Sequence, residues 1–137
     1  MSTLWDDLEV LGYEVGTLVP VVYGTPQWAK DCKKIRNQAA NEKIAGGIIA
    51  LARLGEKLIG TGKCKILQGT GGLFELRADG VRYYFGRLKY DGLDRWVLLR
   101  AENKAGRSEA SKPILKSATI ILDALQKRLS EIPRKPQ

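Results

Sequence analysis

Residues 73 to 85 read Leu73-Phe-Glu-Leu-Arg-Ala-Asp-Gly-Val-Arg-Tyr-Tyr-Phe85. Two strand-like runs flank an Asp-Gly pair, which is a strong signal for a tight turn between antiparallel strands. Because the side chains of a strand alternate between its two faces, Phe74 and Leu76 point one way while Glu75 and Arg77 point the other. The stretch therefore predicts a β-hairpin with one apolar and one polar face.

The hydrophobic period changes along the rest of the chain and divides it into further elements. The predicted segments are a strand at 19–23, a helix capped by Thr25, a second helix capped by Asn41, strands at 65–68, 73–77, 81–85 and 96–100, and a helix capped by Ser111. This order predicts an α+β domain. We expect a small antiparallel β-sheet of about four to five strands, an N-terminal helical hairpin packed on one face, and a C-terminal helix.

Two details of these elements carry expectations of their own. The run Trp96–Leu99 is apolar on both faces, which favours a central strand. The pair Gly46-Gly47 falls inside the second predicted helix, where each glycine costs up to roughly 1 kcal/mol relative to alanine. We therefore expect another element to pack closely against these glycines.

Seven polar residues share one predicted face of the sheet. They are Glu75, Arg77, Arg82, Tyr84, Arg100, Glu102 and Lys104. Guanidinium groups bind phosphates through paired hydrogen bonds, and an aromatic ring among them lets a base stack. An ordinary solvated face with cross-strand ion pairs fits the pattern equally well, so the alternation alone leaves both interpretations open.

The 137 residues suffice for one domain, and they carry a formal charge of +8. Residues 1 to 20 hold four acidic residues and no basic ones, so residues 21 to 137 carry +12. A basic body of this strength is typical of a protein that binds RNA or DNA, although charge also serves solubility. We divide the chain into an acidic N-terminal extension at 1–17, a domain at 18–130 and a disordered tail at 131–137.

The absence of histidine excludes several kinds of site, because Ser-His-Asp and Cys-His pairs and histidine-based zinc sites all need imidazole. Cys32 and Cys64 lie far apart without a CxxC spacing, and we interpret them as buried core residues of a reduced, cytoplasmic protein. No apolar stretch approaches the roughly 20 residues of a membrane span. We therefore expect no metal, no cofactor and no membrane partner.

Four segments occur in a telling order: Val21-Val-Tyr-Gly-Thr-Pro-Gln-Trp28, Leu73-Phe-Glu-Leu-Arg77, Val81-Arg-Tyr-Tyr-Phe85 and Trp96-Val-Leu-Leu-Arg-Ala-Glu-Asn-Lys104, followed by an amphipathic helix. Together they resemble the HigB-like, phage-derived branch of the RelE toxin superfamily, over roughly residues 18 to 130. The resemblance implies a RelE-like fold. It also implies the toxin of a type II toxin-antitoxin system, an mRNA interferase that cuts ribosome-bound mRNA without a metal. Its expected partner is a small antitoxin, often of the helix-turn-helix type.

In the chemistry that the resemblance implies, the RNA 2′-hydroxyl attacks the adjacent phosphate, so one proton must leave, the 5′ oxygen must be protonated and the charge on the phosphorane must be neutralised. By position, Arg77 and Arg82 match the family's functional arginines and are expected to hold the scissile phosphate. Lys104 matches the first lysine of a Lys-Lys pair, as a phosphate ligand or proton carrier. The residues predicted to contact RNA are Tyr84, Lys89, Arg100 and Arg107.

Three positions depart from the family pattern, with Arg100 in place of a histidine, Glu102 in place of a phenylalanine and Ala105 in place of the second lysine. These departures leave two alternatives open. One is a non-catalytic module that binds RNA or DNA on the same scaffold. The other is a phage-derived interaction protein whose basic face docks an acidic partner.

Overall fold

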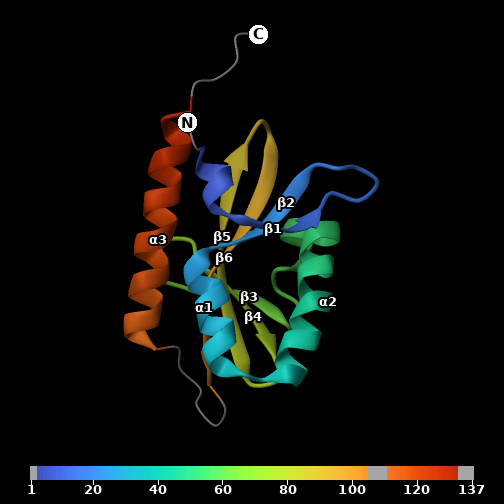
Figure 1. Cartoon of the computed structure of the whole chain (residues 1–137), viewed down its shortest axis with the longest axis vertical. Coiled ribbons are helices and arrows are strands. Elements are labelled where there is room, and N and C mark those ends of the chain that lie inside the picture. Colours follow the sequence, from blue (N-terminus) through green and yellow to red (C-terminus); the bar gives the residue numbers. More distant parts are fainter. Residues whose placement is uncertain (1–2, 105–110, 133–137) are drawn as a thin grey trace.

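The chain forms one six-stranded mixed sheet with α-helices on both of its faces (Figure 1). The computed structural model describes residues 3–104 and 111–132. Its elements, in chain order, are η1 (Leu4–Asp7), β1 (Glu9–Tyr13), β2 (Pro20–Gly24), α1 (Pro26–Ile35), α2 (Gln38–Leu54), η2 (Gly55–Leu58), β3 (Cys64–Ile66), β4 (Phe74–Ala78), β5 (Val81–Tyr90), β6 (Leu93–Asn103) and α3 (Lys112–Ser130).

The sheet has the order β1-β2-β6-β5-β4-β3, with β2 and β6 parallel and every other neighbouring pair antiparallel. The expectation of a four- to five-stranded antiparallel sheet with an N-terminal helical hairpin is therefore wrong, because two strands precede the helices and the sheet is mixed. The cause is the path of the chain between β2 and β6. The meander β3 to β6 returns the chain to β2 from the far edge, so that β6 runs beside β2 in the same direction.

The acidic segment predicted as an extension contributes to the fold. Strand β1 pairs with β2 at one edge of the sheet, and the side chains of Leu4 and Leu8 are buried. Residues 133–137 of the predicted disordered tail lie outside the described residues.

Two clusters of buried side chains fill the two sides of the sheet. Alternation along β5 sends Tyr83 and Phe85 to the cluster beneath α1 and α2, and sends Tyr84 to the cluster beneath α3. Figure 1 shows α2 and α3 on opposite sides of the strands. The run Trp96–Leu99 is buried throughout and lies in β6, between β2 and β5, which confirms the predicted central strand.

The helix boundaries depend on two caps. The Trp28 N–H donates to Thr25 Oγ1 over 3.1 Å at the start of α1, as predicted. Helix α2 begins at Gln38 and is capped by Asn37, not by Asn41. The reason is Arg36, whose left-handed φ of 50° ends α1 and reverses the chain earlier than the hydrophobic period indicates.

The expected close packing at the two glycines of α2 is also wrong. A Cβ added at Gly46 would meet nothing within 4 Å, and one at Gly47 would meet only Ile44 and Leu76, at 3.6 and 3.9 Å. Ordinary contact of that kind does not require glycine.

Candidate functional site

The predicted polar face exists, and the strand register arranges it in two rows. One row runs across the sheet from Glu75 to Tyr84 and on to Arg100. The other runs from Arg77 to Arg82 and on to Glu102. Both rows lie on the side of the sheet that carries α3, because Tyr84 belongs to the cluster beneath that helix.

Glu75 is the centre of the first half of this face. Its side chain is fully buried, and Arg77 Nε donates to Glu75 Oε2 over 2.7 Å. Arg82 Nη1 lies 3.4 Å from Oε1, and Lys65 Nζ lies 3.8 Å from Oε2. Oε1 accepts no hydrogen bond from the described residues. We call Lys65, Glu75, Arg77 and Arg82 the Glu75 cluster.

The cations of the Glu75 cluster differ in their access to solvent. The side chain of Arg77 is 47% exposed, whereas that of Arg82 is 9% exposed. A ligand arriving from solvent therefore meets Arg77 before Arg82. Glu75 was not among the residues predicted to act in the chemistry, although the alternation had placed it on the polar face.

Lys104 lies directly after β6, and its backbone N–H donates to the Gly80 carbonyl over 2.8 Å. Arg82 pairs with Glu102, and Lys104 follows Glu102 by two residues, one position past the end of β6. The structure thus places Arg77 and Arg82 opposite each other and Lys104 just beyond the end of β6. Lys104 is buried.

Tyr84 is buried, although the sequence predicted that it contacts RNA. Its hydroxyl donates to Glu102 Oε2 over 2.6 Å, and the same oxygen accepts the Ser111 N–H over 3.1 Å. Burial first, and then the hydrogen bond to Glu102, raises the pKa of Tyr84 well above its usual value. The ring has no exposed surface, so it offers no face on which a base could stack.

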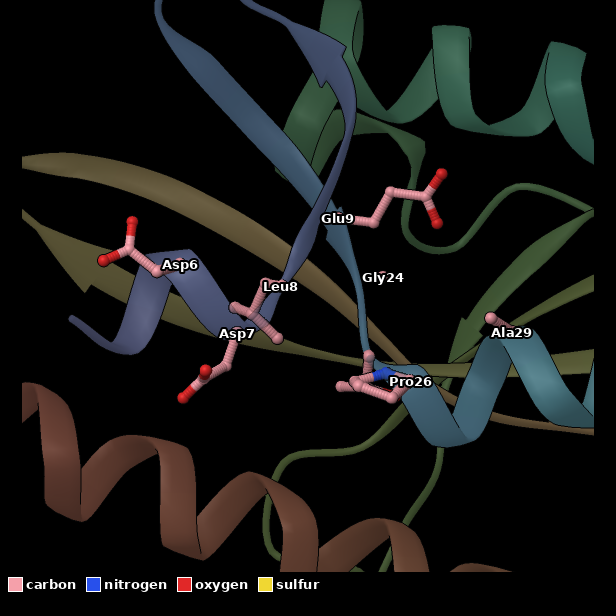
Figure 2. A pocket seen from close by; sticks show the side chains of 8 residues that line it. Asp6, Asp7, Leu8, Glu9, Gly24, Pro26 and Ala29 are labelled. Atoms are coloured by element: carbon pink, nitrogen blue, oxygen red, sulfur yellow. The ribbon is translucent and has the colours of Figure 1, made fainter. Parts of the chain in front are cut away.

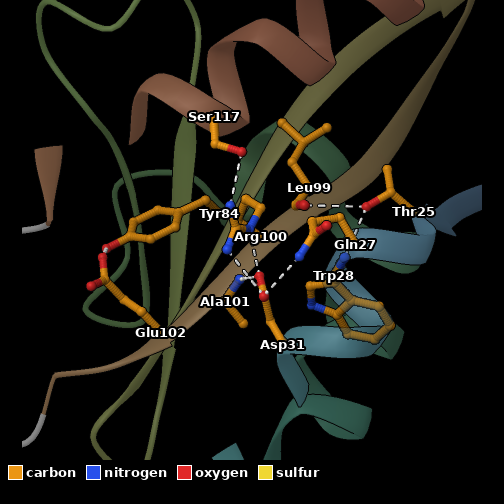
Figure 3. Close-up of polar contacts among 10 residues, drawn as sticks. All are labelled: Thr25, Gln27, Trp28, Asp31, Tyr84, Leu99, Arg100, Ala101, Glu102 and Ser117. Carbon is orange, nitrogen blue, oxygen red and sulfur yellow. Dashed lines mark hydrogen bonds and ion pairs between the residues drawn. The ribbon is translucent and has the colours of Figure 1, made fainter. Parts of the chain in front are cut away.

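Arg100 is engaged by a buried carboxylate (Figure 3). Its Nε and Nη2 donate to the two oxygens of Asp31 over 2.6 and 3.1 Å, and its Nη1 donates to Ser117 Oγ over 2.8 Å. Asp31 also accepts the Ala101 N–H over 3.0 Å. We call Asp31, Arg100 and Ser117 the Asp31 clamp, because it ties α1, β6 and α3 together.

Sequence reasoning missed Asp31, although one signal could have found it. Asp31 is the only acidic residue of α1, in which three lysines surround it in sequence. A lone carboxylate of that kind can face inward toward a cation on the sheet.

Of the two remaining predicted RNA contacts, Lys89 is not brought to this face. Lys89 is exposed and pairs with Asp94 near the far end of β5, seven residues and about 24 Å along the strand from Arg82. Arg107 lies outside the described residues, as does Ala105.

A cavity of about 330 Å³ lies between η1 and the start of α1. Its lining includes three acidic residues, Asp6, Asp7 and Glu9. Figure 2 shows that the carboxylates of Asp6 and Glu9 point away from each other. Among the described residues no group of three or more acidic or cysteine side chains could hold a metal ion.

The cysteines are poor nucleophiles. Both are free thiols, and burial raises the pKa of Cys32 and of Cys64 to about 11, so the unreactive neutral thiol prevails near pH 7. No helix within residues 3–104 and 111–132 is both long and apolar enough to cross a bilayer.

The chain matches no protein-family model, and no curated protein matches it in sequence. The case for a function therefore depends on the Glu75 cluster and on the motifs quoted above.

Proposed function

We propose that the chain is a metal-independent endoribonuclease that cuts mRNA on the ribosome, and that it is the toxin of a type II toxin-antitoxin system. The observation that carries this proposal is the pairing of Arg77 and Arg82 with one buried carboxylate, that of Glu75. Arg77 and Arg82 supply two cations for the phosphate, Lys104 supplies a third from the residue that follows β6, and Glu75 supplies the base for the attacking hydroxyl.

Binding of RNA begins at Arg77, which is the accessible cation of the cluster. Phosphate and carboxylate both accept paired hydrogen bonds from a guanidinium, so the scissile phosphate competes with Glu75 for Arg77. Once Arg77 turns to the phosphate, Glu75 Oε2 is left without its hydrogen bond of 2.7 Å. That oxygen then accepts the proton of the 2′-hydroxyl.

The remaining steps use the two buried cations. Arg82 stabilises the charge that develops on the phosphorane, and its low exposure strengthens this interaction because water screens it less. Lys104 donates a proton to the leaving 5′ oxygen. The products of this attack are a 2′,3′-cyclic phosphate on one fragment and a 5′-hydroxyl on the other, with atoms and charge balanced without a metal.

The partners belong to the same proposal. The substrate is ribosome-bound mRNA in the cytoplasm. A small antitoxin binds the toxin and inhibits it. The basic body of the chain, +12 over residues 21 to 137, supports an attraction to a polyanion.

The test is induced expression of the full chain followed by mapping of transcript ends. We expect growth arrest with new transcript ends, and loss of both in Arg82→Ala. Lys89→Ala is the matched control, because it removes an exposed cation from the same strand about 24 Å away. Absence of arrest and of cleavage by the folded wild-type chain contradicts the proposal.

One observation favours a second function, a non-catalytic RNA-binding module. The Glu75 side chain is fully buried whereas that of Arg77 is 47% exposed, so the cluster presents a cation to RNA but no accessible base. Binding of RNA with a steep salt dependence and no cleavage would support this alternative.

A further inference from the structure

We propose that two copies of this chain associate, with the tip of the β1–β2 hairpin of one copy docked in a groove beside α2 of the other. This inference is independent of the proposed function. Both halves of the contact are present in one chain, and they are complementary in charge and share apolar side chains.

The groove has a volume of about 480 Å³ and lies between α2 and β4. Its floor is apolar and includes Ile44, Ala50, Leu58 and Leu76. Two cations, Lys43 and Lys63, line it with the carboxylate of Asp79, and Arg77 borders it from β4 while its guanidinium pairs with Glu75. An apolar floor with a basic rim suits an apolar side chain that arrives with acidic neighbours.

The two glycines of α2 keep this groove open. Gly46 and Gly47 both line it, and neither is required by close packing, since an added Cβ would meet open space or ordinary contact. Glycine in the middle of a helix costs about 0.5–1 kcal/mol relative to alanine. The missing side chains leave room for an occupant, and the packing of the single chain offers no other reason for them.

The hairpin is the matching half. Leu18 is 89% exposed and Val15 is 65% exposed at its tip. Figure 1 shows that the tip projects outward beyond the end of α2. The hairpin, residues 9 to 24, contains two acidic residues, Glu9 and Glu14, and no basic ones, and Glu14 adjoins the tip.

The tip is also ordered, so docking does not have to fix a loose loop. Glu14 N–H donates to the Val19 carbonyl over 2.8 Å, and Thr17 N–H donates to the Glu14 carbonyl over 3.1 Å. The Val19 N–H donates to Thr17 Oγ1 over 3.0 Å. A tip that is already in its bound shape loses less conformational entropy on association.

The distribution of exposed apolar residues selects this side of the molecule. In the described chain, every large apolar side chain that is exposed lies on the hairpin, on α2 or on β3, except Ile120 of α3. Val15 and Leu18 at the tip, and Ile49 and Leu54 on α2, leave exposed apolar surface on both halves of the proposed contact, and such surface marks interaction sites. A second copy fits best because it supplies an acidic, apolar tip to a basic, apolar groove, and a twofold arrangement in which each copy gives and receives a hairpin closes as a dimer.

The rim offers a cation to the incoming acid. Lys43 is paired with Asp79 at 3.1 Å and Arg77 with Glu75 at 2.7 Å. The ammonium group of Lys63 has no partner among residues 3–104 and 111–132. We assign it to a carboxylate of the docked hairpin, Glu14 being the acid nearest the tip.

Sedimentation velocity of the full chain tests this proposal, over concentrations from about 1 μM to about 1 mM, which span weak to moderate affinities. We expect reversible dimerisation. Leu18→Lys should abolish it by placing a cation at the basic groove, Gly47→Leu by filling the groove, and Lys63→Glu by repelling the acidic hairpin.

Two controls accompany these variants. Ile120→Lys changes an exposed apolar residue of α3 on the far side, and Lys116→Glu reverses the charge of an exposed lysine on the same helix, so both should leave the dimer intact. Leu18→Lys and Lys63→Glu alter exposed side chains only, so they report even if Gly47→Leu disturbs the helix. A wild-type chain that stays monomeric throughout, or a dimer that survives Leu18→Lys or Lys63→Glu, overturns the proposal. Equal loss of the dimer in Ile120→Lys overturns it as well.

Discussion

The sheet face beneath α3 holds two acid–arginine groups that resemble each other in composition and differ in how completely they are closed. In the Asp31 clamp, both carboxylate oxygens accept hydrogen bonds, and the side chains of Asp31 and Arg100 are only 5% and 16% exposed. In the Glu75 cluster, one carboxylate oxygen accepts no hydrogen bond from the described residues, and the principal partner, Arg77, is half exposed.

This difference indicates that the Asp31 clamp stabilises the fold and that the Glu75 cluster is the group suited to chemistry. The Asp31 clamp joins three elements, and no incoming group can replace Arg100 without breaking them apart. The Glu75 cluster can exchange a partner, because Arg77 can turn toward solvent while Arg82 remains beside the carboxylate. A buried acid with one replaceable cation is suited to chemistry, and a buried acid with fixed partners is suited to holding the fold.

The largest effect is expected from breaking the Asp31 clamp. Asp31→Ala leaves Arg100 without its counter-charge in a largely buried position, and removal of one member of a buried pair costs about 3–5 kcal/mol. The free energy of unfolding from urea titration measures this loss. Asp7→Ala is the control, since the exposed Asp7–Arg128 pair at 2.7 Å should contribute no more than about 1 kcal/mol. Equal losses in the two variants would remove the distinction between closed and open pairs.

The second effect concerns cleavage. Glu75→Gln keeps the size of the side chain and removes the proton acceptor, so we expect the rate of RNA cleavage to fall by about 10²- to 10⁴-fold, the usual contribution of a general base. Single-turnover cleavage measures the rate, and the unfolding midpoint of the variant shows that the protein is folded. Full activity in folded Glu75→Gln would assign Glu75 to structure, beside Asp31.

The third effect concerns RNA binding. Arg77→Ala should weaken binding and lower the slope of log affinity against log salt by about one, because one phosphate contact is lost. Its cost in stability should be small, since the side chain is 47% exposed. Filter binding over a salt series measures the slope, and Lys89→Ala should leave it unchanged. An identical slope in Arg77→Ala and the wild type would place the RNA elsewhere.

The smallest effect is the contribution of Tyr84 to the pH dependence of stability. Tyr84 lies between Glu75 and Arg100 in the first row. Its folded pKa is raised by burial and by Glu102, so above about pH 10 the unfolded chain loses this proton while the folded chain keeps it. Stability should therefore fall as the pH rises above 10. Tyr84→Phe should reduce the slope of unfolding free energy against pH in that range, and an unchanged slope would show that Tyr84 does not contribute.

The strand alternation predicted which polar residues share a face, because period two is a local property of each strand. Pairing is not local. The parallel contact between β2 and β6 joins segments separated by more than seventy residues, and nothing within either segment indicates it. The first strand, Glu9–Tyr13, escaped notice because its residues do not alternate clearly between polar and apolar.

The site was predictable to the same extent. Arg77 and Arg82 lie opposite each other as the alternation indicated, whereas the commitment of Arg100 to Asp31 depends on a helix packed across the sheet. Exposure was the least predictable property. The burial of Tyr84 and Lys104 arises from tertiary packing that the pattern within a strand does not contain.

The most direct test of the Glu75 cluster is the chemistry of the RNA ends that the purified chain produces on ribosome-bound mRNA in the presence of a metal chelator. We expect fragments that end in a 2′,3′-cyclic phosphate and begin with a 5′-hydroxyl, formed by the wild type and by Lys89→Ala but not by Glu75→Gln or Arg82→Ala. Fragments that end in a 3′-hydroxyl, or no fragments at all, would contradict the account.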